Sequence, residues 1–442
     1  VFLDLNTTCG TPDYPRILKR ADSAMQFTMT QTGAIKFCDC AVQQAMHFAQ
    51  LMVIPDLDFD LNLGFTQIHF QLKDITFADF TLKKIFLNFE GEKFMNVGAD
   101  GCTVMLKLKW LFRQTSYPYL QDQGEGQIFV NGASLKAYVG SDPNYDDCPG
   151  HVKILIQRAD LLFDQLKIQL FGGSSWIYQS LINVILEAIQ KDISKIISDV
   201  LMGSIDQLVT AMLNNDGLFK TYGENYSMII KDERMLDGFE VGLGYLTVPM
   251  SGYIYQFDKL NDEFIQTRML NKISVKANNH MVYSIHEVAF SNLFYIAHKY
   301  YDLYSSTNYK MLDTPAFQIT NANTLVKCKV LYKNQTITIQ LTGKPGWKSV
   351  TRWDERTQMV ANLTEVFFTF QHYKNDFLGD QIEISDLIKD VVKRMQEAIE
   401  EVPYQINVTP FIDFNLFFVM YDTNEKTLRW VGDNPEECIP WE

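Results

Sequence analysis

The chain has 442 residues, of which 47% are hydrophobic and 21% are charged, so it is long enough for two or three domains and too apolar for intrinsic disorder. Its formal net charge of −14 and the lack of a basic run argue against a nucleic-acid partner. No stretch has the pattern of a transmembrane helix or a signal peptide. Because the chain begins at Val1, we interpret it as a processed mature form or a trimmed fragment.

Residues 1–170 are predicted to form a helical region followed by strands. Pro15 is suited to the first turn of a helix, which Ile54-Pro55-Asp56 ends because proline cannot continue it. Apolar and polar residues then alternate over 57–82, which predicts antiparallel strands with one face in solvent. The pattern recurs at 104–110, 127–139 and 152–170, with predicted turns at Gly124, Gly126, Asn131-Gly132 and 147–150.

Residues 176–212 have the pattern of one long amphipathic helix, about 55 Å in length. Asn183, Glu187 and Lys191 interrupt its apolar run, so this helix is not a membrane span. Its apolar face needs an equally long partner, and the preceding strands are the expected one.

The second half repeats the order of helix, strands and helix, which indicates an internal duplication. We predict helices at 281–301 and at 384–402, and Pro403 ends the second one. Strands are predicted at 239–248, 253–257, 316–320, 324–332, 336–342, 363–371 and 411–421.

No motif for catalysis or metal binding is recognisable. His286-Glu287 lacks the second histidine of a zinc-peptidase motif, and His298 is better explained as a surface residue than as a ligand. Gly172-Gly173-Ser174-Ser175 is better explained as a strand-to-helix turn with a serine cap than as an anion site. We therefore predict a protein that is not an enzyme and that holds no metal and no cofactor.

Seven cysteines are too few and too scattered for a disulfide scaffold, and they lack the spacing of a zinc site. Their odd number leaves at least one free thiol or an intermolecular bridge. Five sequons, which predict glycosylation in a secreted protein, occur at Asn6, Asn225, Asn334, Asn362 and Asn407.

Several short motifs occur in an order that is typical of one known family. They are Pro15-Arg16-Ile17 at the first helix, Ile54-Pro55-Asp56 at its end, 69–75 with 80–82, Leu108-Lys109-Trp110 with Cys148 ahead of a strand, Met281-Val282-Tyr283 with 291–294, and 414–421. In this order they resemble the family of bactericidal/permeability-increasing, lipopolysaccharide-binding and cholesteryl-ester-transfer proteins. The match covers nearly the whole chain.

The resemblance implies an α+β fold of two pseudo-symmetric barrels joined by a central sheet into a boomerang, each barrel being a long helix wrapped in a highly curved antiparallel sheet. It implies an N-terminal lipid-binding barrel at 1–225, a central sheet and linker at 226–280, and a C-terminal lipid-binding barrel at 281–442. The family usually joins the position of Cys148 to a cysteine on the long helix, but this chain has none near Ser198. We expect that disulfide to be absent, or Cys148 to pair elsewhere, for example with Cys102.

The implied function is non-enzymatic binding of phospholipid-like amphiphiles in two apolar tunnels, with lipid carriage or transfer between membranes. The protein is expected to be a secreted or lumenal monomer that contacts membranes or lipid particles transiently. Bound phospholipid or fatty acyl lipid is the expected ligand. The residues expected to contact it are Ile17, Phe48, Met52, Ile182, Ile185, Ile189, Ile193, Tyr283, Leu293, Leu387, Val391 and Met395.

A membrane-docking tip is expected at 109–113, with Tyr117-Pro118-Tyr119 close by. The alternative, that these residues pack into the end of their own barrel, stays open. The residues of the expected tip are Lys109, Trp110, Leu111, Phe112 and Arg113.

The leading alternative function is a host-defence or microbial-surface protein that recognises a lipid or glycolipid. Family members that bind lipopolysaccharide carry a cluster of lysines around the tryptophan of this tip, whereas this chain keeps Lys107, Lys109 and Arg113. The main electrostatic attraction between an anionic glycolipid and this tip would therefore be missing. An enzyme finds no support in the sequence, and an intracellular contact-site protein would need a membrane anchor that the sequence does not show.

Overall fold

The computed structural model divides the chain into two compact units, which interleave in sequence. Unit 1 comprises Val1–Gly33, Ser141–Lys153 and Thr210–Ile439. Unit 2 comprises Ala34–Gly140, Ile154–Val209 and Pro440–Glu442. The domain boundaries predicted near residues 225 and 280 stay a prediction.

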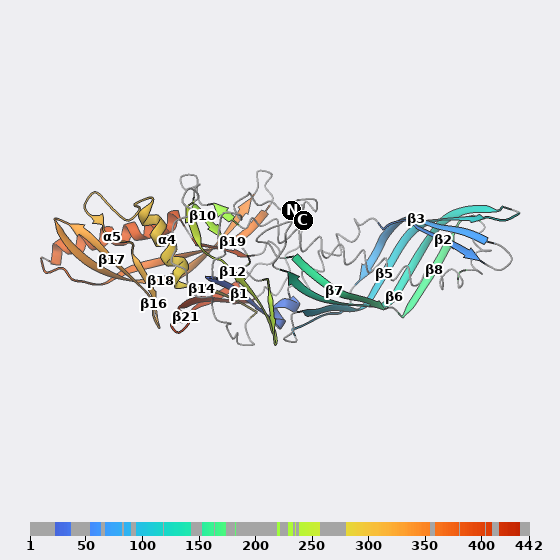
Figure 1. Cartoon of the computed structure of the whole chain (residues 1–442), viewed down its shortest axis with the longest axis horizontal. Coiled ribbons are helices and arrows are strands. Elements are labelled where there is room, and N and C mark those ends of the chain that lie inside the picture. The colour runs from blue at the N-terminus through green and yellow to red at the C-terminus, as the bar shows by residue number, and fades with distance from the viewer. Residues whose placement is uncertain are drawn as a thin grey trace. The chain divides into compact units, whose positions relative to one another are not determined.

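Antiparallel sheet makes up most of the secondary structure in the parts of both units that the structure describes (Figure 1). Within the long helix predicted at 176–212, only Ile182 is among the described residues, and it is helical. The described residues are 23–36, 54–62, 67–81, 84–89, 94–117, 119–142, 153–162, 164–173, 182, 219–221, 229–232, 235, 238–256, 280–353, 359–379, 381–402, 404–408 and 415–433.

Unit 2 is built on a seven-stranded sheet. Its strands are β2 Leu57–Asn62, β3 Gln67–Thr81, β4 Lys84–Asn88, β5 Met95–Gln114, β6 Gln121–Asp142, β7 Lys153–Leu162 and β8 Gln165–Phe171. They lie in the order β2-β3-β5-β6-β7, with β4 also on β5 and β8 also on β6. The alternation over 57–82 is thus confirmed as two strands, which pair antiparallel.

Glycines lie inside β6 and not at turns, so the turns predicted at Gly124, Gly126 and Asn131-Gly132 are wrong. At Gly124 a Cβ would lie 2.1 Å from the carbonyl oxygen of Phe171 and 2.7 Å from the indole nitrogen of Trp110. Gly132 has a φ of +65° and is skipped in the pairing of β6 with β5. The first glycine therefore permits close packing, and the second forms a bulge that lets a long strand continue.

Unit 1 contains a six-stranded sheet, sheet I, whose strands come from distant parts of the chain. They are β1 Met25–Thr30, β11 Glu240–Gly242, β12 Tyr245–Met250, β14 Met281–His286, β21 Asn415–Asp422 and β22 Thr427–Asp433. Their order is β11-β12-β1-β14-β22-β21, so β1 lies between β12 and β14 and pairs antiparallel with both.

The helical region predicted for 15–53 is wrong at 25–30, which form β1, whereas 31–36 are helical. In β1 the odd-numbered residues are apolar and the even-numbered residues are polar, which is the period of a strand. The polar face is buried and is satisfied partly within sheet I, since the hydroxyls of Thr28 and Thr247 lie 3.2 Å apart.

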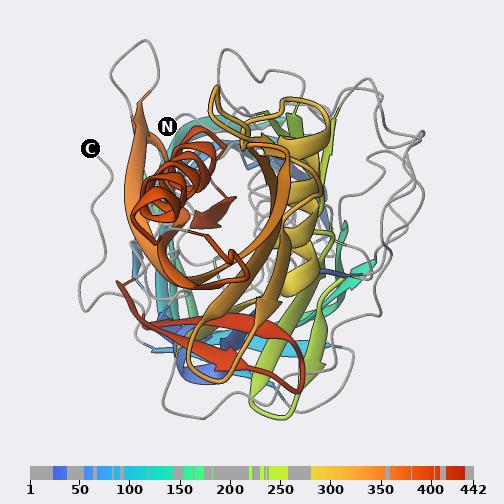
Figure 2. The ribbon, with the colours of Figure 1, turned by 90° about the vertical axis from the view of Figure 1, so that its left-hand side faces the viewer.

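A second sheet of unit 1, sheet II, curves around the helix α5 Gln381–Glu401, which packs against one of its strands (Figure 2). Its strands are β15 Lys310–Met311, β16 Ala316–Ile319, β17 Thr324–Tyr332, β18 Gln335–Trp353, β19 Met359–Asn375 and β20 Tyr404–Val408. The order is β15-β17-β18-β19-β20, with β16 also on β17, and α5 packs against β19. The predicted second helix and the strands near 316, 324, 336 and 363 are confirmed, although β18 and β19 are longer than predicted.

Unit 1 also contains a three-stranded sheet. It consists of β9 Phe219–Thr221, β10 Ile229–Asp232 and β13 Ile254–Gln256 in the order β13-β10-β9. The helix α4 Glu287–Lys299 packs against β13, β14 and β16. Among the helices of the described residues, none combines the length and the apolarity that a membrane span requires.

The helix predicted at 281–301 begins later, because its first residues form β14. Met281 to Ile285 are buried on both faces of sheet I, and a short apolar run of this kind looks the same in a buried strand and a buried helix. His286 then caps α4: its Nδ1 accepts a hydrogen bond from the Val288 backbone N–H at 3.2 Å.

The His286 cap predicts that unit 1 loses stability in mild acid. Burial lowers the pKa of His286 below its usual value, although the neighbouring Glu287 opposes this. The unfolded chain therefore takes up the proton first, so this stabilisation is complete above about pH 6.5 and declines as the pH falls toward the lowered folded pKa. We expect His286→Asn, which keeps a capping oxygen, to reduce the loss between pH 7.5 and 5.5 by up to about 1 kcal/mol. Urea unfolding at both pH values measures this, and an unchanged pH dependence in the variant would contradict it.

Candidate functional site

Five of the residues predicted to contact lipid lie together in unit 1. Tyr283 lies on β14, Leu293 on α4, and Leu387, Val391 and Met395 on α5. Each side chain is at most 5% exposed, and all belong to one hydrophobic cluster, the unit 1 core, to which β1, β14, α4, β15 to β20, α5 and β22 contribute. The structure therefore brings these five candidates into one apolar interior.

Simple periodicity places these side chains. Leu387, Val391 and Met395 follow one another at intervals of four residues, so they share one face of α5. On sheet I, Tyr283 is the Cα partner of both Phe27 and Trp430. The Phe27 and Tyr283 ring centroids lie 4.8 Å apart. The apolar face of α5 and the inner face of sheet I thus line the same cluster.

The unit 1 core also holds an aromatic group that sequence reasoning missed. The ring centroid of Phe290 lies 5.1 Å from those of Phe317 and Phe368, 5.3 Å from that of Tyr404 and 6.4 Å from that of Trp430. These five residues, the aromatic cluster, come from α4, β16, β19, β20 and β22, and all are buried. Because five separate elements contribute one residue each, no local sequence pattern signals the group.

Few polar atoms reach the aromatic cluster. The Tyr404 hydroxyl donates to the carbonyl oxygen of Gly252 at 2.9 Å, and the ammonium group of the buried Lys231 lies 4.3 Å from the Tyr404 ring centroid. The Trp430 indole Nε1 finds no acceptor among the described residues. Elsewhere in the unit 1 core, burial raises the pKa of the Cys328 thiol to about 12, so this group is uncharged at neutral pH. Such an interior favours contact with hydrocarbon over acid–base chemistry.

In unit 2, Ile182 joins a second hydrophobic cluster, the unit 2 core, and is 6% exposed. This core is formed mainly by the inward residues of β3, β5, β6 and β8. A residue from the predicted long helix therefore packs against the sheet that was its expected partner. The other lipid-contact candidates of the first half lie outside the described residues, namely Ile17, Phe48, Met52, Ile185, Ile189 and Ile193.

The expected membrane-docking residues on β5 do not form one exposed surface. Trp110 and Phe112 are 1% and 6% exposed and belong to the unit 2 core. Lys109 and Arg113 are exposed and Leu111 is half-buried, as the period of two requires. The Trp110 indole donates to the carbonyl oxygen of a β8 residue at 3.2 Å. For Trp110 and Phe112, the alternative that they pack into their own unit is therefore the correct one.

Three exposed apolar residues lie just beyond the end of β5, in the hairpin between β5 and β6. Tyr117, Tyr119 and Leu120, the hairpin tip, are 85%, 67% and 55% exposed. The loop is anchored on β3, because the backbone N–H and hydroxyl of Thr115 both donate to the Gln67 carbonyl oxygen, at 3.0 and 3.1 Å. The anchored loop therefore presents two tyrosines and a leucine to solvent.

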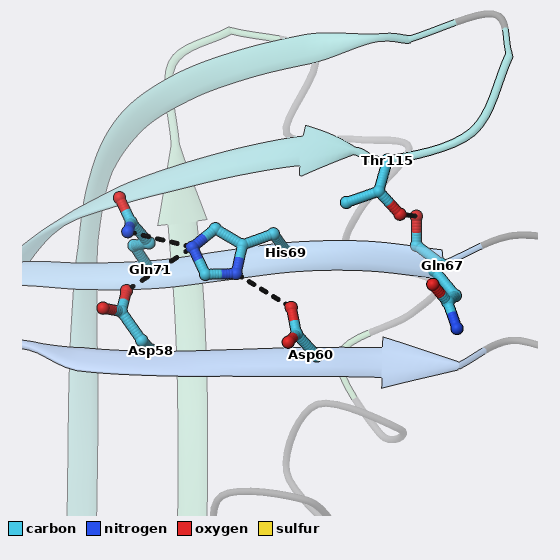
Figure 3. A network of polar contacts seen from close by, with 6 residues as sticks. All are labelled: Asp58, Asp60, Gln67, His69, Gln71 and Thr115. Atoms are coloured by element: carbon cyan, nitrogen blue, oxygen red, sulfur yellow. Dashed lines mark hydrogen bonds and ion pairs between the residues drawn. The ribbon is translucent and has the colours of Figure 1, made fainter.

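A polar network holds β2 to β3 next to this loop (Figure 3). His69 Nδ1 lies 2.9 Å from Asp60 Oδ1, and its Nε2 lies 3.0 Å from the amide nitrogen of Gln71 and 3.8 Å from a carboxylate oxygen of Asp58. On the neighbouring strand, Lys109 donates to a carboxylate oxygen of Asp74 at 2.7 Å, which lowers the pKa of Asp74. This outer face of the sheet therefore carries paired charges.

Some of the remaining predicted sites lie among the described residues. Asn334 is exposed at the turn between β17 and β18, Asn362 lies in β19 and Asn407 in β20, whereas Asn6 and Asn225 lie outside the described residues. Cys102 is a buried free cysteine, so it does not pair with Cys148. The described ranges contain no group of histidine, cysteine or acidic side chains that could hold a metal ion.

The fold of this chain is similar to that of a protein of known structure. A crystal structure of lipopolysaccharide binding protein matches it with a TM-score of 0.59 over 95% of this chain and 100% of that chain, at 10% sequence identity. At that identity the likeness shows the fold alone. No protein-family model matches the chain.

A putative BPI/LBP family protein of Arabidopsis thaliana is 21% identical over 198 residues, which cover 44% of this chain. The match spans 40% of the length of that relative. The resemblance to the bactericidal/permeability-increasing and lipopolysaccharide-binding protein family, which the order of the motifs predicts, is confirmed by these two comparisons.

Proposed function

We propose that the chain binds phospholipid-like amphiphiles without chemical turnover and carries them between membranes or lipid particles. The observation that carries the proposal is the unit 1 core, where residues chosen for lipid contact from the sequence lie with a buried aromatic cluster between α5, α4 and two sheets. The likeness in fold to lipopolysaccharide binding protein supports it. A second lipid site in unit 2, beside Ile182 and the predicted long helix, is part of the proposal.

The physics of transfer favours such an interior. Each buried CH₂ group contributes about 0.8 kcal/mol, so moving an acyl chain from water into the protein is strongly favourable. Moving it from a bilayer into an equally apolar interior is close to neutral, since both environments exclude water. A carrier can therefore load and unload at a membrane without a chemical energy source.

The finer features inferred from the resemblance belong to the same proposal. They are the two pseudo-symmetric barrels joined by a central sheet into a boomerang, the monomeric state, and a secreted or lumenal location with glycosylated sequons. The exposed turn position of Asn334 supports access by a glycosyltransferase. The recognition of an anionic microbial glycolipid is less favoured, because Lys109 of the expected basic tip is paired with Asp74.

Native mass spectrometry of the purified protein, followed by lipid extraction, tests the proposal. We expect one or more co-purifying phospholipids or acyl lipids, and saturable binding of a fluorescent phosphatidylcholine by protein from which lipid has been removed. The absence of co-purifying lipid together with the absence of binding of the fluorescent probe would overturn the proposal.

The hairpin tip predicts a defect in docking that leaves folding intact. We expect the triple variant Tyr117→Ser, Tyr119→Ser, Leu120→Ser to bind phosphatidylcholine vesicles about tenfold or more weakly, because it loses the apolar area that would enter the headgroup layer. Its free energy of unfolding should change by less than about 0.5 kcal/mol per residue, since all three side chains are exposed. Co-sedimentation with vesicles measures the binding.

A matched control comes from the same chain. Leu243 is 82% exposed and lies outside the hairpin tip, so Leu243→Ser removes a solvent-exposed leucine without changing that surface. The control should sediment with vesicles like the unaltered protein. Equal binding by the triple variant would show that docking occurs elsewhere.

A further inference from the structure

Among the described residues, two indole groups are fully buried, and they differ in one respect. Trp110 and Trp430 are 1% and 0% exposed. The Trp110 Nε1–H donates to the Phe171 carbonyl oxygen, whereas Trp430 Nε1 has no hydrogen-bond partner among the described residues. An unmet N–H donor in a nonpolar interior is destabilising, and buried donors in proteins are normally satisfied. Trp430 Nε1–H is therefore a buried donor that is available to an acceptor on a bound ligand.

The surroundings of Trp430 place this donor among the candidate lipid contacts. Trp430 and Leu428 face the unit 1 core from β22, and Trp430 is the Cα partner of Tyr283. Its ring contacts Phe290, which precedes Leu293 by one helical turn on α4. The indole N–H therefore lies in the interior where we propose that acyl chains bind.

Other unpartnered buried groups among the described residues fit this role less well. Ser284 and Thr427 lie on the strand positions that alternate with Tyr283 and Leu428, so they occupy the opposite face of sheet I. Tyr309 belongs to the unit 1 core, but charged side chains lie near its hydroxyl. Burial, and after it the charge of Asp390, raises the pKa of Tyr309. The surroundings of Trp430 are mainly apolar and aromatic, so its indole N–H has the fewest alternative hydrogen-bond acceptors in the part of the protein that the structure describes.

We propose that Trp430 Nε1–H donates a hydrogen bond to the carbonyl oxygen of an ester-linked acyl chain bound in unit 1. This inference rests on the proposed lipid-binding function and adds the chemical class of the ligand. An ester carbonyl suits the site because it is a strong acceptor that carries no net charge, so it can enter an apolar interior at modest cost. It also lies at the junction of the acyl chain and the headgroup, which fits a single polar contact in an otherwise apolar site.

The test compares two lipids and two proteins. The lipids are a diacyl phosphatidylcholine and the corresponding dialkyl ether lipid, which has the same chains and headgroup but no ester carbonyl. The proteins are the unaltered chain and Trp430→Phe, which keeps an aromatic ring and removes the N–H. We expect the unaltered chain to bind the ester lipid about 3- to 10-fold more tightly than the ether lipid, and Trp430→Phe to lose this preference while its affinity for the ether lipid stays the same.

A second readout does not depend on the folding of the variant. In the unaltered protein labelled with ¹⁵N at its indoles, the Trp430 Nε1–H resonance should move downfield with the ester lipid and not with the ether lipid. The Trp110 resonance is the internal control, since its hydrogen bond to the protein is already made.

The outcomes separate this inference from the proposed function. Binding of neither lipid by the unaltered chain would overturn both. Binding of both lipids with equal affinity, or an equal loss for both in Trp430→Phe, would leave lipid binding in place and overturn the role of Trp430. An indole resonance that moves equally with both lipids would also overturn it.

Discussion

Replacing Phe290 by alanine is expected to lower the free energy of unfolding of unit 1 by about 3–5 kcal/mol. Phe290 is fully buried, and its ring contacts those of Phe317, Phe368, Tyr404 and Trp430. Four separate strands meet this one side chain from α4, so truncation leaves a cavity that no single neighbour can fill. The lost burial and the lost ring contacts act in the same direction.

The measurement has to report on unit 1 alone, because a chain with two units need not unfold in one step. Hydrogen exchange of peptides from α4 and β19 in increasing urea gives this local stability. Phe290→Leu is the control, since it keeps most of the volume and should cost clearly less. If both variants were as stable as the unaltered chain, Phe290 would not organise this core.

Replacing Trp110 by alanine is expected to destabilise unit 2 by about 3–5 kcal/mol, although this position was a candidate for membrane docking. Its ring stacks on Phe70 at 6.4 Å between centroids, and its N–H donates to the Phe171 carbonyl oxygen. Gly124, which lies against the indole, has no side chain, so it cannot fill the space that the indole leaves. The loss should appear as faster hydrogen exchange in peptides from β3, β5 and β8.

Trp110→Phe separates packing from the hydrogen bond, because it keeps an aromatic ring on Phe70 and removes only the indole donor. It should cost less than the alanine variant. A Trp110→Ala protein with unchanged stability in unit 2 and a strong loss of vesicle binding would instead support direct contact of Trp110 with a membrane. The hairpin tip variant provides the reference for such a docking defect.

Periodicity was sufficient to predict much of the fold. The alternation over 57–82 gave β2 and β3, and the four-residue spacing of Leu387, Val391 and Met395 gave the buried face of α5. The same alternation could have shown that Trp110 and Phe112 share the face of Leu108 and so point inward. The motif resemblance favoured a docking surface there, but side-chain direction on β5 decided otherwise.

Other features depend on contacts between distant residues. β1 does alternate apolar and polar residues, but only over six positions, and its neighbours on either side of sheet I, β12 and β14, come much later in the chain. Gly124 was interpreted as a turn because the groups that exclude a side chain there, the Phe171 carbonyl oxygen and the Trp110 indole, lie on other strands. The aromatic cluster draws one residue from each of five elements, so hydrophobicity alone could not single out Phe290 from other phenylalanines.

The position of β1 also sets a limit on the order of assembly. Ser23, just before this strand, bonds through its hydroxyl to the Met250 carbonyl oxygen, 227 residues away, and β1 is flanked by β12 and β14. During synthesis on the ribosome, the first described strand therefore emerges long before either neighbour exists. Both of its edges stay open to other partners until the middle of the chain has followed, and sheet I is complete only when β22 arrives. We infer that closure of unit 1 is slow and largely post-translational, since its defining contacts are far apart in sequence.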